Sequence, residues 1–214
     1  MNYQVIRSGD SRSFPDHHPL VSKAAASGEV VVITGSMAGS QLARLADPGS
    51  KLAILVELAG ECLGIHTGEQ HGDEGSNVLG FARFRLGQAA PSDLVELVRQ
   101  PRTPEPAIAA AKQVLEGAGL QVAVCNDFAG RIIDRLVRPY YNAALTRLDE
   151  GLASAADLDT TLKLGLGYPE GPIGLLERTG LAHHHDVTLA LFDAYGDPAY
   201  APARRARVAK LRGG

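Results

Sequence analysis

The pattern of apolar residues changes once along the 214-residue chain, near residue 125. Before that point, short runs rich in β-branched residues, such as residues 30–33, alternate with stretches at helical spacing. This alternation is typical of a parallel sheet with crossover helices. After Asn126, apolar residues keep a helical period through one segment after another. The sequence therefore predicts an α/β domain at residues 1–124 and an all-α domain at residues 125–214.

The same patterns place the individual elements. Four strands are predicted, at residues 30–33, 52–56, 77–86 and 120–124, and the first two are predicted to be buried. Helices are predicted at residues 37–46 and 104–117, and residues 1–28 are predicted to be irregular apart from a short helix at 23–27. In the second part we expect a long helix kinked at Pro139, a helix that begins at Ser154, and a last helix at 181–195.

Composition excludes several classes of protein. Twenty-one Lys and Arg face 24 Asp and Glu, a formal net charge of −3, which provides no general positive field for nucleic acid. No apolar run is long enough for a membrane span, so we expect neither nucleic acid nor a membrane as a partner. Cys62 and Cys125 make no disulfide framework, and a reducing cytoplasm fits them.

A glycine-containing turn follows the strand predicted at residues 30–33. Gly35 and Gly39 lie between that strand and a helix, and Glu57 comes 22 residues after Gly35, at the end of the next strand. This is the context of a dinucleotide-binding turn, but the full G-x-G-x-x-G pattern is missing. Two interpretations stay open, a residual nucleotide site and a purely structural turn, and residues 30–33 can also be a later strand of the sheet.

Length adds to this picture. A complete dinucleotide-binding sheet needs on the order of 150 residues. The α/β domain predicted here is shorter, so we expect a reduced version of that fold.

The second half carries a family resemblance. The segment TLKLGLGYPEGPIGLLERTGL, at residues 161–181, closely resembles the C-terminal domain of 3-hydroxyacyl-CoA dehydrogenases. The segment DRLVRPYYNAALTRLDEGLASAADLD, at residues 134–159, is similar to that domain's first helix and the start of its second. The final AYGDPAYAPARRARVAKL resembles the second copy in two-copy members that act on 3-hydroxybutyryl-CoA or 3-hydroxyadipyl-CoA. In those members the second copy has a shortened Rossmann-like domain.

The resemblance implies a fold and an activity. The fold is a reduced Rossmann-like α/β domain followed by an all-α helical dimerisation domain, which implies a homodimer. The family reaction is the NAD-dependent oxidation of a 3-hydroxyacyl-CoA to a 3-oxoacyl-CoA. It implies NAD as cofactor and an acyl-CoA-type small molecule as ligand, and the turn with Gly35, Gly39 and Glu57 described above is the candidate cofactor site.

The family's catalytic residues can be carried over position by position. In the family a His accepts the hydroxyl proton and a Glu orients it, while a Ser and an Asn hold the substrate oxygen. The Glu falls on Glu96 and the Asn on Asp134, whereas the His position is Ala82 or, aligned from Glu96, nearer Phe84. No Ser lies at residues 57–62, where the family has one.

Two hypotheses follow from these positions. The first is an NAD-dependent 3-hydroxyacyl-CoA dehydrogenase that retains Glu96 and Asp134, with His66 or His71 as a replacement base. The second is a non-catalytic relative, with a degraded site, that binds an acyl-CoA or serves as a dimerisation partner of a complete dehydrogenase. No metal site is predicted, because the three consecutive residues His183, His184 and His185 point in different directions on a helix.

Overall fold

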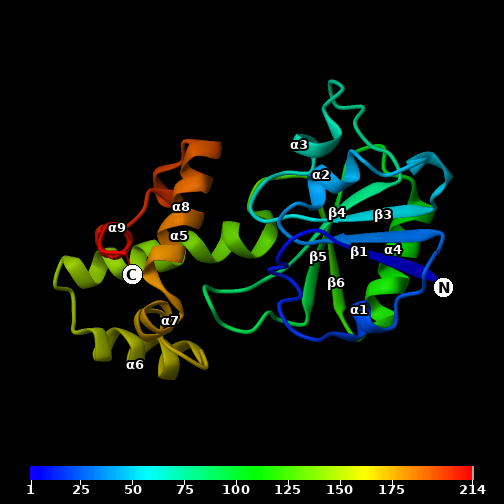
Figure 1. Ribbon diagram of the computed structural model, residues 1–214. Helices are drawn as coiled ribbons and strands as arrows, with labels where there is room; N and C mark the ends of the chain where they lie inside the picture. The colour runs from blue at the N-terminus through cyan, green and yellow to red at the C-terminus, as the bar shows by residue number, and fades with distance from the viewer. Residues whose placement is uncertain (214) are drawn as a thin grey trace. The chain divides into compact units, whose positions relative to one another are not determined.

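A computed structural model describes residues 1–213 of the chain, which form two compact units (Figure 1). The first, here called the sheet unit, contains Met1–Arg85 and Pro91–Arg131. The second, the helical unit, contains Leu86–Ala90 and the described chain from Ile132 onward. The domain boundary predicted between residues 124 and 125 lies within the last strand of the sheet. The division into domains at this point stays a prediction.

The sheet unit has six strands and four α-helices. The strands are β1 (Tyr3–Arg7), β2 (Val30–Thr34), β3 (Ala53–Glu57), β4 (Val78–Arg83), β5 (Leu94–Arg99) and β6 (Gln121–Asn126). The helices are α1 (Pro19–Ser22), α2 (Ala38–Leu42), α3 (Gly64–Thr67) and α4 (Glu105–Gly117), with a 3-10 turn η1 (Pro48–Ser50).

The helical unit is built from five α-helices. They are α5 (Arg131–Asp149), which begins at the last residue of the sheet unit, α6 (Ala155–Leu166), α7 (Pro172–Thr179), α8 (Leu181–Tyr195) and α9 (Arg204–Leu211). A 3-10 turn, η2 (Pro198–Tyr200), separates the last two.

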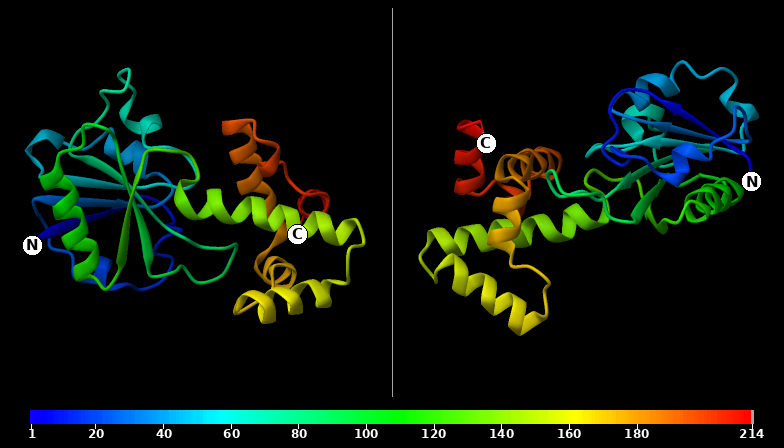
Figure 2. Two further views of the ribbon diagram at one scale, coloured as in Figure 1. Left: turned by 180° about the vertical axis from the view of Figure 1, so that it is seen from behind. Right: turned by 60° about the horizontal axis from the view of Figure 1, so that its bottom comes forward.

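The strands of the sheet lie in their order along the chain, β1-β2-β3-β4-β5-β6 (Figures 1 and 2). All neighbours are parallel except β4 and β5, which are antiparallel. The usual dinucleotide-binding sheet has the order 3-2-1-4-5-6, and its crevice lies where that order reverses beside the first strand. In the part of the chain that the structure describes, β1 is an edge strand and the order does not reverse.

Two of the six strands were not predicted. Residues 1–28 were expected to be irregular, but residues 3–7 form β1, whose half-buried edge position leaves no clean apolar signal in YQVIR. Strand β5 was missed because the charged Glu96 interrupts its apolar run. The helix expected at residues 23–27 is also wrong. Helix α1 begins at Pro19, where the His18 ring nitrogen Nδ1 accepts a hydrogen bond from the N–H of Leu20, at 3.1 Å.

Both faces of the sheet are covered. On one face, side chains of β2 to β5 pack against α4, Phe14 and Leu20. On the other face, the alternate side chains of β2, β3 and β5, such as Val31 and Val98, pack against α2 and Leu63 at the start of α3. Burial on both faces explains why β2 and β3 are continuous apolar runs rather than alternating ones.

The GYPEGP segment forms a tight corner between α6 and α7. Asp159 of α6 accepts hydrogen bonds from the N–H groups of Ile173 and Gly174, both at 2.9 Å, and so caps the start of α7. Gly171 makes room for this cap, because a Cβ at Gly171 would lie 2.2 Å from the Cβ of Asp159. The segment is therefore a packing corner, as its glycines and prolines predict.

Replacing this cap tests the account of the corner. Asp159→Ala removes both acceptors from the start of α7, and we expect a loss of about 1–2 kcal/mol in the free energy of unfolding. Chemical denaturation followed by circular dichroism measures it. Asp193→Ala is the matched control, since Asp193 is exposed in α8 and should change stability by less than about 0.5 kcal/mol. Equal effects of the two variants would contradict the capping role.

Candidate functional site

Strands β4 and β5 bring the predicted catalytic Glu96 directly opposite Ala82. The two residues are register partners in the antiparallel pair, so their side chains lie on the same face of the sheet. Both are buried, with 4% of Glu96 and 6% of Ala82 exposed. Phe84 lies beyond the end of β4. The residue that faces Glu96 is therefore Ala82, and its methyl group cannot accept a proton.

Four successive backbone N–H groups of the turn after β2 are bonded within the protein. The N–H of Gly35 donates to the Glu57 carboxylate at 2.6 Å. The next two N–H groups, of Ser36 and Met37, donate to the carbonyls of Asp10 and Ser8, both at 2.9 Å. The N–H of Ala38 donates to the carbonyl of Gly35 at 3.0 Å. A phosphate-binding turn needs such groups pointing at the ligand, whereas these four point at the protein itself.

Packing accounts for both glycines of this turn. Gly35 has a φ of 106°, and a Cβ there would lie 2.4 Å from the carbonyl oxygen of Ser8. At Gly39, a Cβ would lie 2.2 Å from Nδ1 of His66, so the glycine lets α3 pack closely on α2. The structure therefore places Gly35 and Gly39 at close contacts within the sheet unit.

Glu57 is a buried carboxylate with three hydrogen bonds, and 7% of the residue is exposed. It accepts from the Ser11 hydroxyl at 2.7 Å, from the N–H of Ser13 at 2.8 Å, and from the N–H of Gly35. The donors come from the loops after β1 and β2, and Glu57 ends β3. The carboxylate thus ties three neighbouring strand ends together.

The space beside Glu57 is small and acidic. A cavity of about 90 Å³ lies there, and ligand pockets usually measure about 300–1,000 Å³. Its charged lining residues are Asp10, Arg12, Glu57 and Glu61. Three carboxylates against one guanidinium give a negative environment, which repels phosphate groups. The residues around Gly35 therefore do not fit the pyrophosphate of NAD.

His66 pairs with a carboxylate in α3. Its Nε2 lies 3.3 Å from a carboxylate oxygen of Glu61, and the other oxygen of Glu61 accepts from the N–H of Ala59 at 3.0 Å. A His held by a carboxylate has the form of a general base with its orienting group. Here the Nδ1 edge of the ring packs against Gly39, so both ring nitrogens face protein atoms. His71 lies in an exposed loop with a φ of 56°.

Asp134, the other predicted catalytic residue, belongs to a buried polar network in the helical unit. Its carboxylate accepts from Nε of Arg138 at 2.7 Å, and the Arg138 side chain is 1% exposed. Nη1 of Arg138 lies 3.1 Å from Nδ1 of His184, whose Nε2 lies 3.0 Å from Oδ1 of Asn142. The Asn142 amide donates to the carbonyls of Ala199 and Ala201, at 3.1 and 3.0 Å.

Only one arrangement of protons suits this network. Arg138 can only donate, so Nδ1 of His184 must be the acceptor, and Nε2 then donates to Asn142. Burial, followed by the nearby positive charge of Arg138, lowers the pKa of His184 to about 3. His184 is therefore neutral at pH 7 and holds α5, α8 and the η2 turn together.

Sequence reasoning missed Arg138, Asn142 and His184 as a group. One signal was available, because Asp134 and Arg138 lie four residues apart on a helix, the spacing of a helical ion pair. The partner on α8 had no such signal, since three consecutive histidines occur there. Their tertiary contacts show that His184 is the buried one, with 0% exposed.

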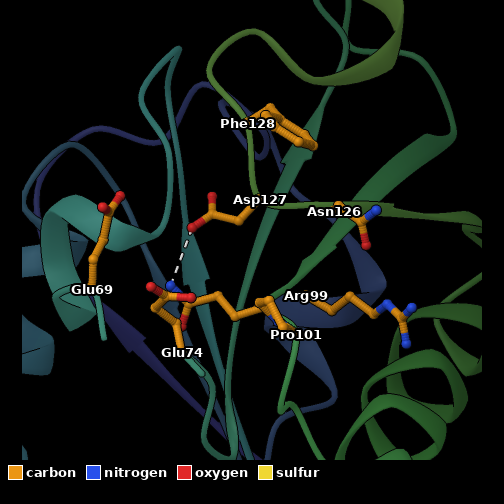
Figure 3. Close-up of a pocket in the computed structure, with 8 residues that line it drawn as sticks. Glu69, Glu74, Arg99, Pro101, Asn126, Asp127 and Phe128 are labelled. Atoms are coloured by element: carbon orange, nitrogen blue, oxygen red, sulfur yellow. Dashed lines mark hydrogen bonds between the residues drawn. The ribbon is translucent and has the colours of Figure 1, made fainter. Parts of the chain in front are cut away.

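A larger hollow lies at the carboxyl ends of β5 and β6 (Figure 3). It measures about 530 Å³ and is lined by Glu69, Glu74, Arg99, Gln100, Pro101, Asn126, Asp127 and Phe128. Asp127 accepts from the N–H groups of Leu63 and Gly64 at 2.6 and 2.8 Å. It also accepts from the Gln100 amide at 3.2 Å, the bond dashed in Figure 3. This carboxylate therefore serves to hold the start of α3.

The remaining candidate groups have structural surroundings. Nowhere in residues 1–213 do three or more His, Cys, Asp or Glu side chains gather as a metal site requires. Burial, with the nearby charge of Glu96, raises the pKa of Cys125 to about 11, so its thiol stays protonated and unreactive. Within the described chain, no helix combines the length and apolar character that a membrane crossing needs.

The basic C-terminal helix is partly neutralised within the helical unit. Arg204 and Arg205 both pair with Asp149, at 2.8 and 2.7 Å, and Lys210 pairs with Asp186 at 2.7 Å. Two carboxylates, one of α5 and one of α8, therefore offset part of the positive charge of α9.

The helical unit matches a family model. Residues 130–211 match the model described as 3-hydroxyacyl-CoA dehydrogenase, C-terminal domain. A mostly parallel α/β sheet followed by this domain defines the class of dehydrogenase-like proteins with a Rossmann-like and a helical domain. Residues 130–211 therefore belong to the family of C-terminal domains of 3-hydroxyacyl-CoA dehydrogenases.

Curated relatives support this assignment. The chain is 34% identical over 110 residues to a 3-hydroxybutyryl-CoA dehydrogenase of Bradyrhizobium diazoefficiens, a match that covers 51% of this chain and 38% of the relative. It is 35% identical over 102 residues to the human mitochondrial hydroxyacyl-coenzyme A dehydrogenase, covering 48% of this chain and 31% of that protein. The match therefore spans well under half the length of these relatives.

Solved structures confirm the predicted fold class. The (S)-3-hydroxybutyryl-CoA dehydrogenase PaaH1 from Ralstonia eutropha superposes with a TM-score of 0.72 and 22% identity, covering 89% of this chain and 70% of that one. A Mycobacterium tuberculosis protein, FadB2, gives a TM-score of 0.70 and 23% identity, covering 86% of this chain and 66% of that one. At this identity the likeness concerns the fold.

The buried imidazole predicts how stability depends on pH. The pKa of His184 is lowered from 6.5 to about 3 on folding, so the unfolded chain binds this proton more readily. Its contribution is complete above pH 6.5 and falls by about 1.4 kcal/mol for each pH unit between 6.5 and 3. Thermal unfolding between pH 7 and pH 4 measures the loss.

His184→Gln should flatten this dependence. A glutamine amide offers an acceptor to Arg138 and a donor to Asn142 but does not titrate. His17→Gln, in an exposed loop of the sheet unit, is the control and should leave the wild-type slope unchanged. If wild type and His184→Gln lost stability in parallel over this range, His184 would not be the titrating group.

Proposed function

We propose that this chain is a member of the 3-hydroxyacyl-CoA dehydrogenase family that binds an acyl-CoA-type ligand without catalysing its oxidation. The observation that carries this proposal is the pairing of Ala82 with Glu96 across β4 and β5. The family resemblance puts a His opposite the orienting Glu, and here a methyl group stands there. Ala82 cannot serve as the base, and the catalytic site is degraded.

The chemistry of the family reaction explains why an alanine at position 82 matters. Removing hydride from a 3-hydroxyl carbon requires that the hydroxyl proton pass to a base within hydrogen-bond reach. Asp134 does not compensate, because its carboxylate is paired with Arg138 within the helical unit and an ionised carboxylate cannot donate to a developing oxyanion. The bonds of Glu57 and of the Gly35 turn further argue against NAD at that turn.

Turnover assays test this proposal. With acetoacetyl-CoA and NADH, we expect the purified protein to show no turnover above background, and calorimetry to show binding of the CoA thioester. Wild type and Glu96→Ala should give the same background rate. Glu105→Ala, which changes an exposed carboxylate of α4, controls for general effects of charge. Measurable turnover abolished by Glu96→Ala alone would show that the chain is a working dehydrogenase.

An active NAD-dependent dehydrogenase is the second candidate. The relatives named above are dehydrogenases, and this activity together with the shared fold favours it. It requires a replacement for the missing base, and His66 with Glu61 is the one His–carboxylate pair that the described part of the sheet unit offers. Loss of turnover in His66→Gln would support it.

We also propose a homodimer formed through the helical unit. Helix α6 has no buried residue, and Leu164 and Leu166 are 83% and 63% exposed. Tyr168, just after the helix, is 41% exposed. Apolar side chains gathered on one element are typical of a surface that is covered in an assembly.

Charge on this surface should separate the subunits. We expect wild-type protein to have the mass of a dimer by light scattering after size exclusion, and Leu164→Glu with Leu166→Glu to have the mass of a monomer. The paired carboxylates would be desolvated against a second apolar surface, at a cost of several kcal/mol. Leu136→Glu, at an exposed leucine of α5, is the control for added charge. A monomeric wild type would contradict the proposal.

A further inference from the structure

Three hydrogen-bond donors from two loops converge at the end of β3. They are the Ser11 hydroxyl, the N–H of Ser13 and the N–H of Gly35, at 2.7, 2.8 and 2.6 Å from the carboxylate oxygens of Glu57. Two of them are backbone groups, whose positions follow from the strands β1 and β2 that precede them. Such convergent donors form an anion-binding site, and the anion bound here is the protein's own Glu57 carboxylate.

The location of this anion site indicates which kind of ligand it would otherwise bind. The donors lie at the carboxyl ends of parallel strands, the edge at which open α/β sheets bind phosphate-containing ligands. We infer that Glu57 acts as an internal anion in a phosphate-type site and thereby excludes NAD(H) from the Gly35 turn. This inference rests on the bonds of Glu57 and is independent of Ala82, because a chain without the catalytic base could still bind the cofactor.

The surroundings of Glu57 reinforce the exclusion. Asp10 and Glu61 line the same cavity of about 90 Å³, so a phosphate entering beside Glu57 would meet three carboxylates. Removing the Glu57 carboxylate would free the Ser11, Ser13 and Gly35 donors together. It would also leave Arg12 and Ser36 in the wall of the enlarged cavity. The emptied site should therefore accept a small phosphate anion.

Anion binding by Glu57→Ala tests the inference. Titration calorimetry with inorganic pyrophosphate should show at least tenfold tighter binding to Glu57→Ala than to wild type, and wild type should not bind NADH. Glu61→Ala is the matched control, since it removes a carboxylate from the same cavity and frees one N–H group, that of Ala59. It should show less than a threefold gain.

Two results would overturn the inference. One is saturable NADH binding by wild type that pyrophosphate displaces, which would show that the turn is open to the cofactor. The other is a folded Glu57→Ala variant with no gain in pyrophosphate affinity. If Glu57→Ala does not unfold cooperatively, Glu57→Ser replaces it, because the serine hydroxyl can still accept one of the freed N–H groups. The turnover assay of the proposed function is separate, so either conclusion can fail alone.

Discussion

The antiparallel pairing of β4 with β5 is the constraint on which the arrangement of the sheet unit depends. It reverses the direction of the sheet after four parallel strands, so β5 and β6 end at the opposite edge from β1 to β4. Its register also places Ala82 opposite Glu96 on one face. A shift of the register by one residue would turn Glu96 to the other face, and burial of both faces by apolar side chains prevents such a shift.

Both units keep charged groups in their interiors, and Glu57 and Arg138 are held there by partners from within the same unit. In the sheet unit, Glu57 binds donors from two loops. In the helical unit, Arg138 lies between Asp134 and His184. A buried charge is tolerated only when it has partners. In this chain the partners are protein atoms, whereas in a catalytic centre such groups would point at a ligand. Asp134 and Glu57, which the sequence marked as candidate site residues, thus stabilise the fold of this chain.

Local signals predicted much of the helical unit and less of the sheet unit. Ser154 begins α6, where its hydroxyl accepts from the N–H of Asp157, as the short-range pattern indicated. Strands β2 and β3 followed from their apolar runs. Strand β1 lies at the edge and buries little, so nothing in its composition marks it. Strand β5 was not predicted because it contains Glu96. A charged residue usually indicates an exposed position, but here the charge is buried.

The residues alone are sufficient to assign the two classes of domain and to match the helical unit to its family, because periodicity and turn residues are local properties of the chain. They also show that no His stands at position 82 or 84. They do not reveal that Glu57 caps the Gly35 turn or that His184 meets Arg138, since these partners lie 22 and 46 residues apart. Such contacts arise only when strands align and helices pack, and they distinguish a binding turn from a structural one.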